Sequence, residues 1–519
     1  VAAFDRLNGM FAFALYDSRS GDAYLVRDPF GIKPLYYAAT ADGVLFSSEL
    51  QTLLATDGVD DSIDATALQA YLKLDFVPGP LSIVRGVRKL EGGSFLRVGR
   101  DAQMEIERYF VRRPAIIDAD AVAQLGHLLD AAVERHLIAD VPVGVFLSGG
   151  IDSSLVAHAA SRLREGNIST FSIGFQESSF DELRHVEAVA RQLGLAPLTR
   201  TLSGESMLGL VRQIGRLMGE PLADGSIYPT YLLAQFAREH VTVALSGDGA
   251  DELFAGYPTY FAHDVVRRMP GPIIALLRRA GGLAHRTVPV SLDNLSPDYK
   301  LKKFLDGMDP DLLRRHIRWM GTFAEEDLPS LLVHHEPDAD RELSSLLAAA
   351  ASDCDGDWLE RLLRTDQRFY LQDGVLVKVD RASMVHSLEV RVPFLDRTVV
   401  AFADGLSGKL KLRGATSKVI LRRLAEMRTP VIAHRPKKGF GAPLGHWFRN
   451  ELRPMLEDVL SPRAVGQRGI FEARFVARLL DDHWSGRRDN RKQIFNLLTF
   501  ALWYDNFSGS HSVVRADAA

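Results

Sequence analysis

The sequence predicts an α/β protein of two or more domains, on three observations. A chain of 519 residues is too long for one hydrophobic core. Its first 110 residues or so are rich in short alternating apolar segments, which favour strands. From about residue 119 strand and helix patterns alternate, and from about residue 258 the chain is mainly helical. Alternating elements predict a doubly wound parallel sheet, here followed by a helical C-terminal part.

Turn residues divide the first segment into hairpins. Ser20-Gly21-Asp22 and Asp42-Gly43 are typical of tight turns between strands. A polar stretch at 108–118 that carries Pro114 predicts a linker. We therefore expect one domain at 1–110, a second at 119–508 and a disordered tail at 509–519. The strands of the first domain are predicted at 11–16, 23–27, 35–39, 45–48 and 94–98.

The second segment is predicted to alternate between helices and strands. Ser179 and Glu182 have the spacing of a capping box, which predicts a helix that ends at Gly194. Ligands of a doubly wound sheet bind beyond the carboxyl ends of its strands, so the loops that follow the strands are candidate sites. The other expected elements are helices at 121–137, 206–218 and 230–240, and strands at 141–147, 168–175 and 241–245.

The composition excludes several classes of protein. A formal net charge of −4 argues against nucleic acid as the main partner. The single cysteine, Cys354, excludes an internal disulfide and a zinc site built from several cysteines. No apolar run reaches the ~18 residues of a membrane helix, and no signal-like segment opens the chain. These features predict a cytoplasmic, reduced setting with no membrane partner.

The first candidate site is the segment Ser148-Gly149-Gly150-Ile151-Asp152-Ser153-Ser154, which joins a predicted strand to a predicted helix. Backbone N–H groups at a helix N-terminus lack partners and carry partial positive charge, so they attract anions. Glycines let a bulky anion approach, hydroxyls add donors, and a carboxylate can hold Mg²⁺. The pattern predicts a phosphate cradle. A helix simply capped by Ser148 is the alternative.

A second predicted strand ends in Ser246-Gly247-Asp248-Gly249-Ala250-Asp251-Glu252. An isolated acidic turn is usually solvated. Three carboxylates behind a strand of the same α/β sheet are better candidates for metal binding or acid–base chemistry. Because both loops follow strands, a single site at one edge of the sheet can use both.

These segments carry a resemblance to a known family. The first loop resembles the pyrophosphate-binding motif of ATP pyrophosphatases. The stretch LSGDGADELFAGY from Leu245 to Tyr257 resembles the matching signature of the asparagine synthetase family. RDPFGIKPLYY from Arg27 to Tyr37 is similar to class II glutamine amidotransferases. Further similar segments, in family order, are FSSEL at 46–50, VDRASM at 379–384, LEVRVPFLD at 388–396 and RPKKGFG at 435–441.

The resemblance implies a partial αββα sandwich of the N-terminal-nucleophile type, then a doubly wound ATP pyrophosphatase domain with a helical C-terminal part. In the family, a front portion with an N-terminal cysteine nucleophile precedes the segment that begins here at Val1. Cys354 lies in the other domain. We therefore expect ammonia as the nitrogen source of this chain, and glutamine in full-length members. Arg27, Asp28 and Glu49 are expected to have structural and interface roles.

By resemblance, the cofactors are ATP and Mg²⁺. Asp152 and Asp251 are expected to hold the metal ion. Leu147 and Ile173 are expected to contact the adenosine, although both could equally be core residues at strand ends. The remaining expected contacts are Ser148, Gly149, Gly150, Ser153 and Ser154 to the β- and γ-phosphates, and Ser246 and Gly247 to the adenosine.

The expected catalytic residues are acidic and basic. Asp248 stands where the family more often has glutamate, and would help to form an acyl-adenylate or deprotonate ammonium. Asp251 is also expected to be catalytic, because it would hold the metal ion. Lys437 or Lys438 would stabilise negative charge on the α-phosphate, and the sequence does not choose between them. Asp380 and Arg391 are two further candidates, for recognition of the acceptor. A salt link between helices is their alternative role.

The implied reaction is that of an asparagine synthetase. ATP converts the β-carboxylate of aspartate to an adenylate, ammonia attacks it, and asparagine, AMP and pyrophosphate are released. A homodimer is compatible with the resemblance. One alternative is another amide-forming amidotransferase or a β-lactam-synthetase-like enzyme with a different acceptor. The other is a non-catalytic nucleotide-binding relative.

Overall fold

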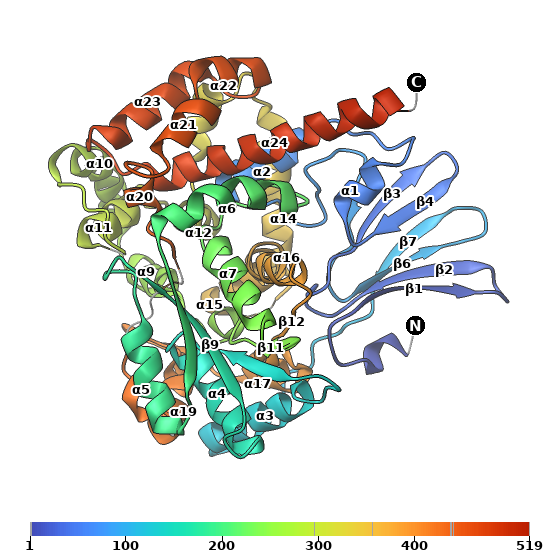
Figure 1. The fold of residues 1–519 in the computed structure, drawn as a ribbon, viewed down its shortest axis with the longest axis vertical. Helices are drawn as coiled ribbons and strands as arrows, with labels where there is room; N and C mark the ends of the chain where they lie inside the picture. Colours follow the sequence, from blue (N-terminus) through green and yellow to red (C-terminus); the bar gives the residue numbers. More distant parts are fainter. Residues whose placement is uncertain (1–2, 295, 355, 436–438, 440, 518–519) are drawn as a thin grey trace.

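The computed structural model describes residues 3–294, 296–354, 356–435, 439 and 441–517, and confirms the predicted α/β class. Two antiparallel sheets form the N-terminal part, and a larger part surrounds a parallel sheet with helices on both faces (Figure 1). Among the helices of these described residues, none combines the length and the low polarity that crossing a membrane requires.

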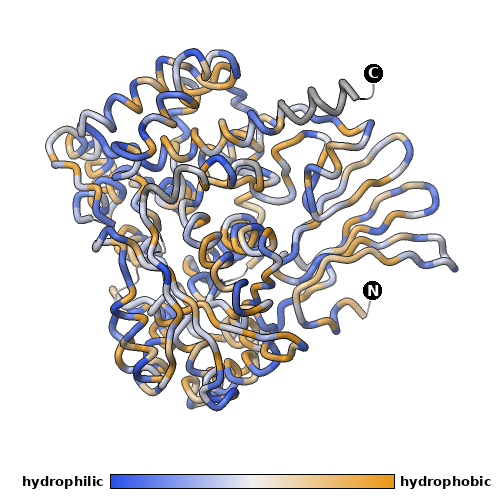
Figure 2. The backbone as a smooth tube through the Cα atoms, viewed as in Figure 1, coloured by the Kyte–Doolittle hydropathy of each residue, from blue (hydrophilic) through white to orange (hydrophobic). Residues whose placement is uncertain are grey.

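The N-terminal sheets have the orders β1-β2-β6-β7 and β4-β3-β5. A small core formed by Leu25, Leu35, Tyr37, Leu90 and Leu96 joins them. The hairpin tips are mostly hydrophilic, whereas the strands carry the apolar residues (Figure 2). The strands are β1 (Ala12–Asp17), β2 (Asp22–Arg27), β3 (Tyr36–Thr40), β4 (Gly43–Ser47), β5 (Arg88–Lys89), β6 (Ser94–Val98) and β7 (Met104–Arg108).

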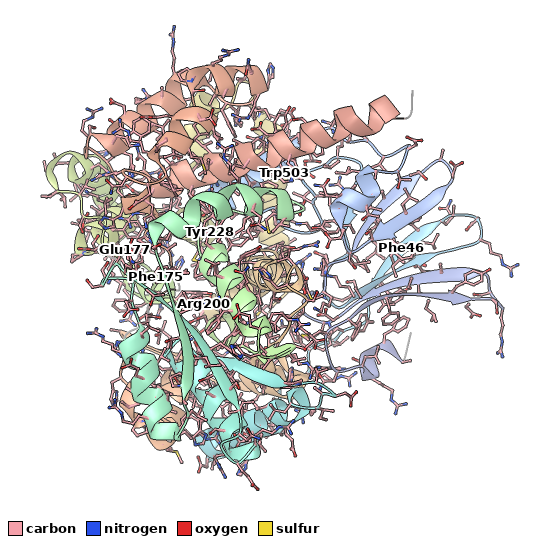
Figure 3. The ribbon with its side chains drawn as sticks, in the orientation of Figure 1. Phe46, Phe175, Glu177, Arg200, Tyr228 and Trp503 are labelled. Carbon is pink, nitrogen blue, oxygen red and sulfur yellow. The ribbon has the colours of Figure 1, made fainter. Side chains whose placement is uncertain are left out.

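Two helices of this part, α1 (Leu50–Leu54) and α2 (Ala65–Leu74), were not predicted. Helix α2 is buried around most of its surface, so its sequence lacks the one-sided apolar pattern that identifies a surface helix. The Tyr71 hydroxyl donates to the Asn496 carbonyl at 2.7 Å, in the last helix of the chain. The two parts therefore share one core, which includes Trp503 (Figure 3).

The parallel sheet has the order β10-β9-β8-β11-β12. The order reverses between β8 (Val143–Phe146) and β11 (Val243–Leu245), because the chain fills one side of β8 first and the other side later. Val145 pairs with Leu245, so these two strands end within one residue of each other. Ligands bind at such a reversal point. The remaining strands are β9 (Ser169–Phe175), β10 (Pro197–Leu202) and β12 (Glu389–Arg391).

The two edge strands, β10 and β12, were not predicted. Strand β10 begins with a proline and is largely polar, and β12 has three residues, so neither has the apolar pattern of a buried strand. A further two-residue pair, β13 (Leu412–Arg413) with β14 (Thr416–Ser417), lies apart from this sheet.

Helices cover both faces of the parallel sheet (Figure 1). On one face lie α3 (Ala121–His136), α4 (Ile151–Leu163), α5 (Leu183–Leu193), α17 (Arg397–Gly405) and α19 (Val419–Arg428), and toward the other lie α6 (Gly204–Leu217), α7 (Ile227–Arg238) and α16 (Val377–Met384).

The rest of the chain is helical, as predicted. It comprises α8 (Ala250–Phe254), α9 (Pro258–Val266), α10 (Gly271–Thr287), α11 (Pro297–Asp306), α12 (Leu312–Met320), α13 (Leu328–Leu331), α14 (Pro337–Ser352), α15 (Trp358–Asp366), a π-helix, η3 (Gln367–Leu376), α18 (Gly408–Lys411), α20 (Leu444–Trp447), α21 (Arg453–Val459), α22 (Pro462–Arg468), α23 (Ala473–Trp484) and α24 (Arg491–Asp517).

One local expectation, the capping box, differs from the structure. Helix α5 begins at Leu183, and Glu182 pairs with Arg435 rather than completing a capping box with Ser179. Helix α24 extends to Asp517, and the disorder that we expected at 509–519 stays a prediction. Residues 518 and 519 lie outside the described residues.

Several apolar side chains of the N-terminal sheets remain exposed. Leu15, Phe46 and Ile106 have exposed fractions of 48%, 50% and 53% (Figure 3 labels Phe46). Phe11 and Phe13, by contrast, pack against the core that includes Phe4. The apolar face that we expected around Phe11, Phe13 and Leu15 is therefore covered only in part.

Arg27 supports the loop after β2. Its buried guanidinium donates to the carbonyls of Lys33, Leu90 and Gly31 at 2.7, 2.6 and 2.8 Å. We expect Arg27→Met to lower the midpoint of thermal unfolding by at least about 5 °C, because each buried carbonyl left without a donor costs about 1–3 kcal/mol. Circular dichroism measures this, with Arg19→Met at an exposed position as control. Equal midpoints for the two variants would contradict a structural role for Arg27.

Candidate functional site

The loops after β8 and β11 meet at a cavity of about 170 Å³, which we call the strand-end cavity. Its walls also include residues of α7 and α16. Most of the predicted site residues line it, namely Leu147, Ser148, Asp152, Ser153, Ile173, Ser246, Gly247, Asp248 and Asp251. Gly149, Gly150 and Ser154 lie next to these residues without lining the cavity, and Ser154 is fully buried.

The backbone of the first loop requires glycine at residue 149. Gly149 has φ +66°, and a Cβ there would lie 2.9 Å from the backbone of His185. The hydroxyls of Ser148 and Ser153 lie 3.1 Å apart, and Ser153 Oγ also accepts from the Ser148 N–H at 3.2 Å. No side chain caps α4, whose N-cap is Gly150. The alternative in which Ser148 caps the helix is therefore not the arrangement observed.

Arg435 contacts the first loop. Its guanidinium donates to the Gly149 carbonyl and pairs with the Glu182 carboxylate. Arg435 belongs to the basic segment that the sequence singled out, so part of that segment contacts the first loop. Lys437 and Lys438 lie outside the described residues.

The two loops are joined by a lysine that the sequence did not single out. The Lys418 ammonium lies 2.6 Å from Asp152 Oδ2 and 2.6 Å from Asp251 Oδ1. Its side chain is 3% exposed. Lys418 precedes α19 and lies far along the chain from both aspartates, in a segment with no recognisable motif. Sequence patterns could not have identified it.

The same two carboxylates suit a divalent cation. The ammonium position shows that both converge on one point. Mg²⁺ prefers oxygen ligands and is often bound by one or two carboxylates together with substrate phosphates. Within the described residues, no group of three or more His, Cys, Asp or Glu side chains is placed to hold a metal. Asp152 and Asp251 therefore fit a Mg²⁺ that arrives with a phosphate ligand.

The second loop packs closely on the first. A Cβ on Gly247 would lie 2.8 Å from the Ser153 nitrogen, so only glycine fits this contact. Ser246 Oγ donates to Asp248 Oδ2 at 2.5 Å, which orients the Asp248 carboxylate at the cavity wall.

Glu252 is a buried acid at the same wall. Burial and the neighbouring Asp251 raise the pKa of Glu252 to about 8. The Tyr257 hydroxyl donates to its carboxylate at 2.6 Å. The cavity therefore contains an acid that can be protonated near neutral pH, beside two carboxylates paired with Lys418.

The two candidates for acceptor recognition lie outside the cavity lining. Asp380 pairs with Lys33 at 2.7 Å and so links α16 to the N-terminal part. Arg391 pairs with Glu389 and donates to the carbonyls of His136 and Ile138. Instead, Lys378 and Ser226, which the sequence did not single out, line the cavity. Glu49 contacts Arg381 at the interface between the two parts.

Comparison with known proteins agrees with this arrangement. Residues 124–505 match the asparagine synthase family, and residues 1–110 match a glutamine amidotransferase domain. A putative glutamine-hydrolyzing asparagine synthetase of Mycobacterium tuberculosis is 36% identical, over 98% of this chain and 78% of its own length. Glutamine-hydrolyzing asparagine synthetase 1 of Bacillus subtilis is 33% identical over 97% and 78%. The chain therefore belongs to the asparagine synthase family, whose members are ligases that form carbon–nitrogen bonds.

Proposed function

We propose that this chain converts aspartate to asparagine with ATP as the source of free energy. A β-carboxylate oxygen of aspartate attacks the α-phosphorus, and the bond to the pyrophosphate oxygen breaks. Ammonia then attacks the acyl carbon of the adenylate, the bond to the AMP oxygen breaks, and one proton leaves the new amide. The products are asparagine, AMP and pyrophosphate.

The observation that carries the proposal is the convergence of Asp152, Asp251 and Lys418 beside the first loop. A site that releases pyrophosphate must neutralise several negative charges on the leaving group. Backbone N–H groups at the start of α4 and the hydroxyls of Ser148 and Ser153 add donors for the phosphates. Leu147, Ile173, Ser246 and Gly247 supply the wall for the adenosine.

Asp152 and Asp251 would hold Mg²⁺, which when bound lowers the charge of the triphosphate. Asp248 is the proposed base that takes the proton from the incoming nitrogen. Lys437 or Lys438 is the proposed cation for the α-phosphate. The proposal needs aspartate, ATP and a nitrogen donor, and requires neither a homodimer nor a membrane. A cytoplasmic setting is proposed, in keeping with the single cysteine.

An acceptor panel tests the reaction. With ATP, Mg²⁺ and ammonium, we expect pyrophosphate and asparagine to form in equal amounts from aspartate, and at least about tenfold less product from glutamate. One extra methylene in a fitted site costs about 1–3 kcal/mol. Coupled pyrophosphate detection and amino-acid analysis measure this. Faster turnover of another acid would favour a different amide-forming enzyme, and no turnover with any acid would favour a non-catalytic relative.

The carboxylates that meet at Lys418 give the second test. Asp152→Asn and Asp251→Asn keep the side-chain shape and remove one charge each. We expect AMP formation in a single turnover to fall about 10²–10³-fold, the effect of losing about 3–4 kcal/mol of electrostatic stabilisation. Asp130→Asn is the control, because Asp130 pairs with Arg428 outside the cavity. Rates like that of the control would contradict the assignment.

The nitrogen source gives the third test. The only cysteine, Cys354, follows α14 in the larger part, away from the matched amidotransferase region. Cleavage of the glutamine amide needs an activated nucleophile, which in this family is a cysteine. We expect the polypeptide of residues 1–519 to use ammonium, with a rate that rises with pH as more ammonia is present. Glutamate released from glutamine in step with asparagine would overturn this expectation.

A further inference from the structure

A cavity of about 440 Å³ is lined by residues of α10, α11 and α12 and of the segment that opens α24, and we call it the charged cavity. It shares no lining residue with the strand-end cavity. Figure 1 places α10 and α11 on the side of the molecule away from the N-terminal sheets. Small-molecule sites commonly have volumes of about 300–1,000 Å³. The charged cavity is therefore a separate candidate site, which the proposed reaction does not use.

Two acids of the charged cavity are paired with arginines. Glu326 Oε1 accepts from Arg278 at 2.8 Å and also from Arg318. Asp489 Oδ2 lies 2.7 Å from Arg491 Nε. These two carboxylates and their arginines therefore neutralise one another within the wall.

The other three acids that line the cavity also have partners. Asp306 lies 2.8 Å from His285, and Asp298 lies 3.9 Å from Lys302. Asp327 accepts a backbone N–H at 3.1 Å, and burial raises its pKa. The carboxylates of the cavity wall are thus accounted for without its remaining cations.

Two of these remaining cations, Lys303 and Lys492, are brought together by the end of α12. Lys303 Nζ donates to the Gly321 carbonyl at 2.6 Å, and Lys492 Nζ donates to the Met320 carbonyl at 3.1 Å. The carbonyls belong to successive residues, so the two ammonium groups lie near each other. Among the described residues, the only carboxylate within 4 Å of either ammonium is that of Asp75, 3.9 Å from Lys492. Each ammonium has three N–H donors, so both have donors left for a ligand.

The pKa of Lys303 reflects this crowding of like charges. Burial and the neighbouring Lys492 lower it to about 7, against the opposite effects of Asp75 and Asp306. Burial also lowers the pKa of Lys492, but Tyr299 and Asp75 help to raise it above its ordinary value. An anion placed between the two lysines would favour the charged form of both.

A third cation, Arg488, stands at the exposed rim of the cavity. Its side chain has no hydrogen bond or ion pair with another described residue. It precedes α24, whose first turn contributes Lys492 and Gln493 to the wall. The N-terminal end of a helix attracts anions, and a guanidinium matches the geometry of a phosphate. With Lys303 charged, three cations against the carboxylate of Asp75 leave two positive charges for a ligand.

We propose that the charged cavity binds a phosphate group, free or as a monoester, between Lys303, Lys492 and Arg488. A phosphate monoester carries a charge of about −1.5 to −2 at pH 7 and three strong acceptor oxygens, which match the two positive charges and the free donors. Because the strand-end cavity takes no part, this binding requires neither ATP nor aspartate. The inference goes beyond the proposed function and does not rest on it.

Calorimetry with sulfate tests the site, because sulfate is a tetrahedral dianion that does not titrate near neutral pH. We expect Lys303→Met and Arg488→Gln each to weaken sulfate binding by the full chain at least about tenfold, since each removes charge-assisted hydrogen bonds. Lys300→Met is the matched control. Lys300 is exposed on the same helix as Lys303 but does not line the cavity, so this variant should bind sulfate like the wild type.

Proton uptake tests whether the sulfate lies at Lys303. At pH 7 about half of Lys303 is neutral, so binding of a dianion should take up about half a proton. Calorimetry in two buffers with different enthalpies of ionisation measures this number. Lys303→Met should abolish the uptake, whereas Arg488→Gln should keep it. Uptake that persists in Lys303→Met would assign the proton to another group, such as His285, and would contradict the placement.

A variant of the other cavity separates the two anion sites. Ser153→Ala changes the strand-end cavity and should leave sulfate binding unchanged. Loss of sulfate binding in this variant, or wild-type affinity in both Lys303→Met and Arg488→Gln, would overturn the inference, as would absence of sulfate binding by the wild type.

Inorganic phosphate and glycerol 3-phosphate distinguish the two sources of the phosphate group. Tighter binding of the ester would assign the site to a phosphate monoester, and tighter binding of inorganic phosphate would assign it to free phosphate. In either case Lys303→Met should weaken the binding at least about tenfold. Binding of neither compound by the wild type would contradict the assignment to phosphate.

Discussion

The ion pairs of Lys418 with Asp152 and Asp251 are the interaction on which the site depends. Two carboxylate oxygens that share one ammonium at 2.6 Å each lie within about 5 Å of each other and would repel by roughly 3 kcal/mol at an effective dielectric constant of about 20. The buried ammonium removes this repulsion and lets the loops after β8 and β11 pack closely. Gly247 and Gly256 are needed for the same reason, because a Cβ on either would collide with the aspartate segments.

This arrangement also explains how a phosphate site can be stable before its ligand is present. Five acids line the cavity, namely Asp152, Glu182, Asp248, Asp251 and Glu252. Lys418 pairs with Asp152 and Asp251 and offsets one of their two negative charges, and protonation of Glu252 removes a further charge, since its pKa is raised to about 8. The N-terminal part contributes at a distance, because its contacts with η3 help to position the helix that carries Lys378.

Sequence patterns predicted the parts of the fold that have one-sided or alternating apolar residues. Strands β1, β6, β8 and β11 and helix α3 were predicted within two residues of their ends. Helix α2 was missed because it is buried all round, and β10 and β12 because edge strands are short or polar. The prediction of a capping box at Ser179 was wrong because the Glu182 carboxylate pairs with Arg435, which is remote in the sequence. The two loops of the site were predicted because they carry motifs. Lys418 and Lys378 were not predicted, because only the folded chain brings them close to these loops.

The central claim is that the site joins the acceptor carboxylate to AMP before nitrogen attacks. Transfer of oxygen from aspartate to AMP tests it most directly. With aspartate labelled by ¹⁸O in the β-carboxylate, ammonium and unlabelled ATP, mass spectrometry of the products should find one labelled oxygen in AMP for each asparagine formed. Asparagine formed without labelled AMP, or with the label in inorganic phosphate, would contradict the account.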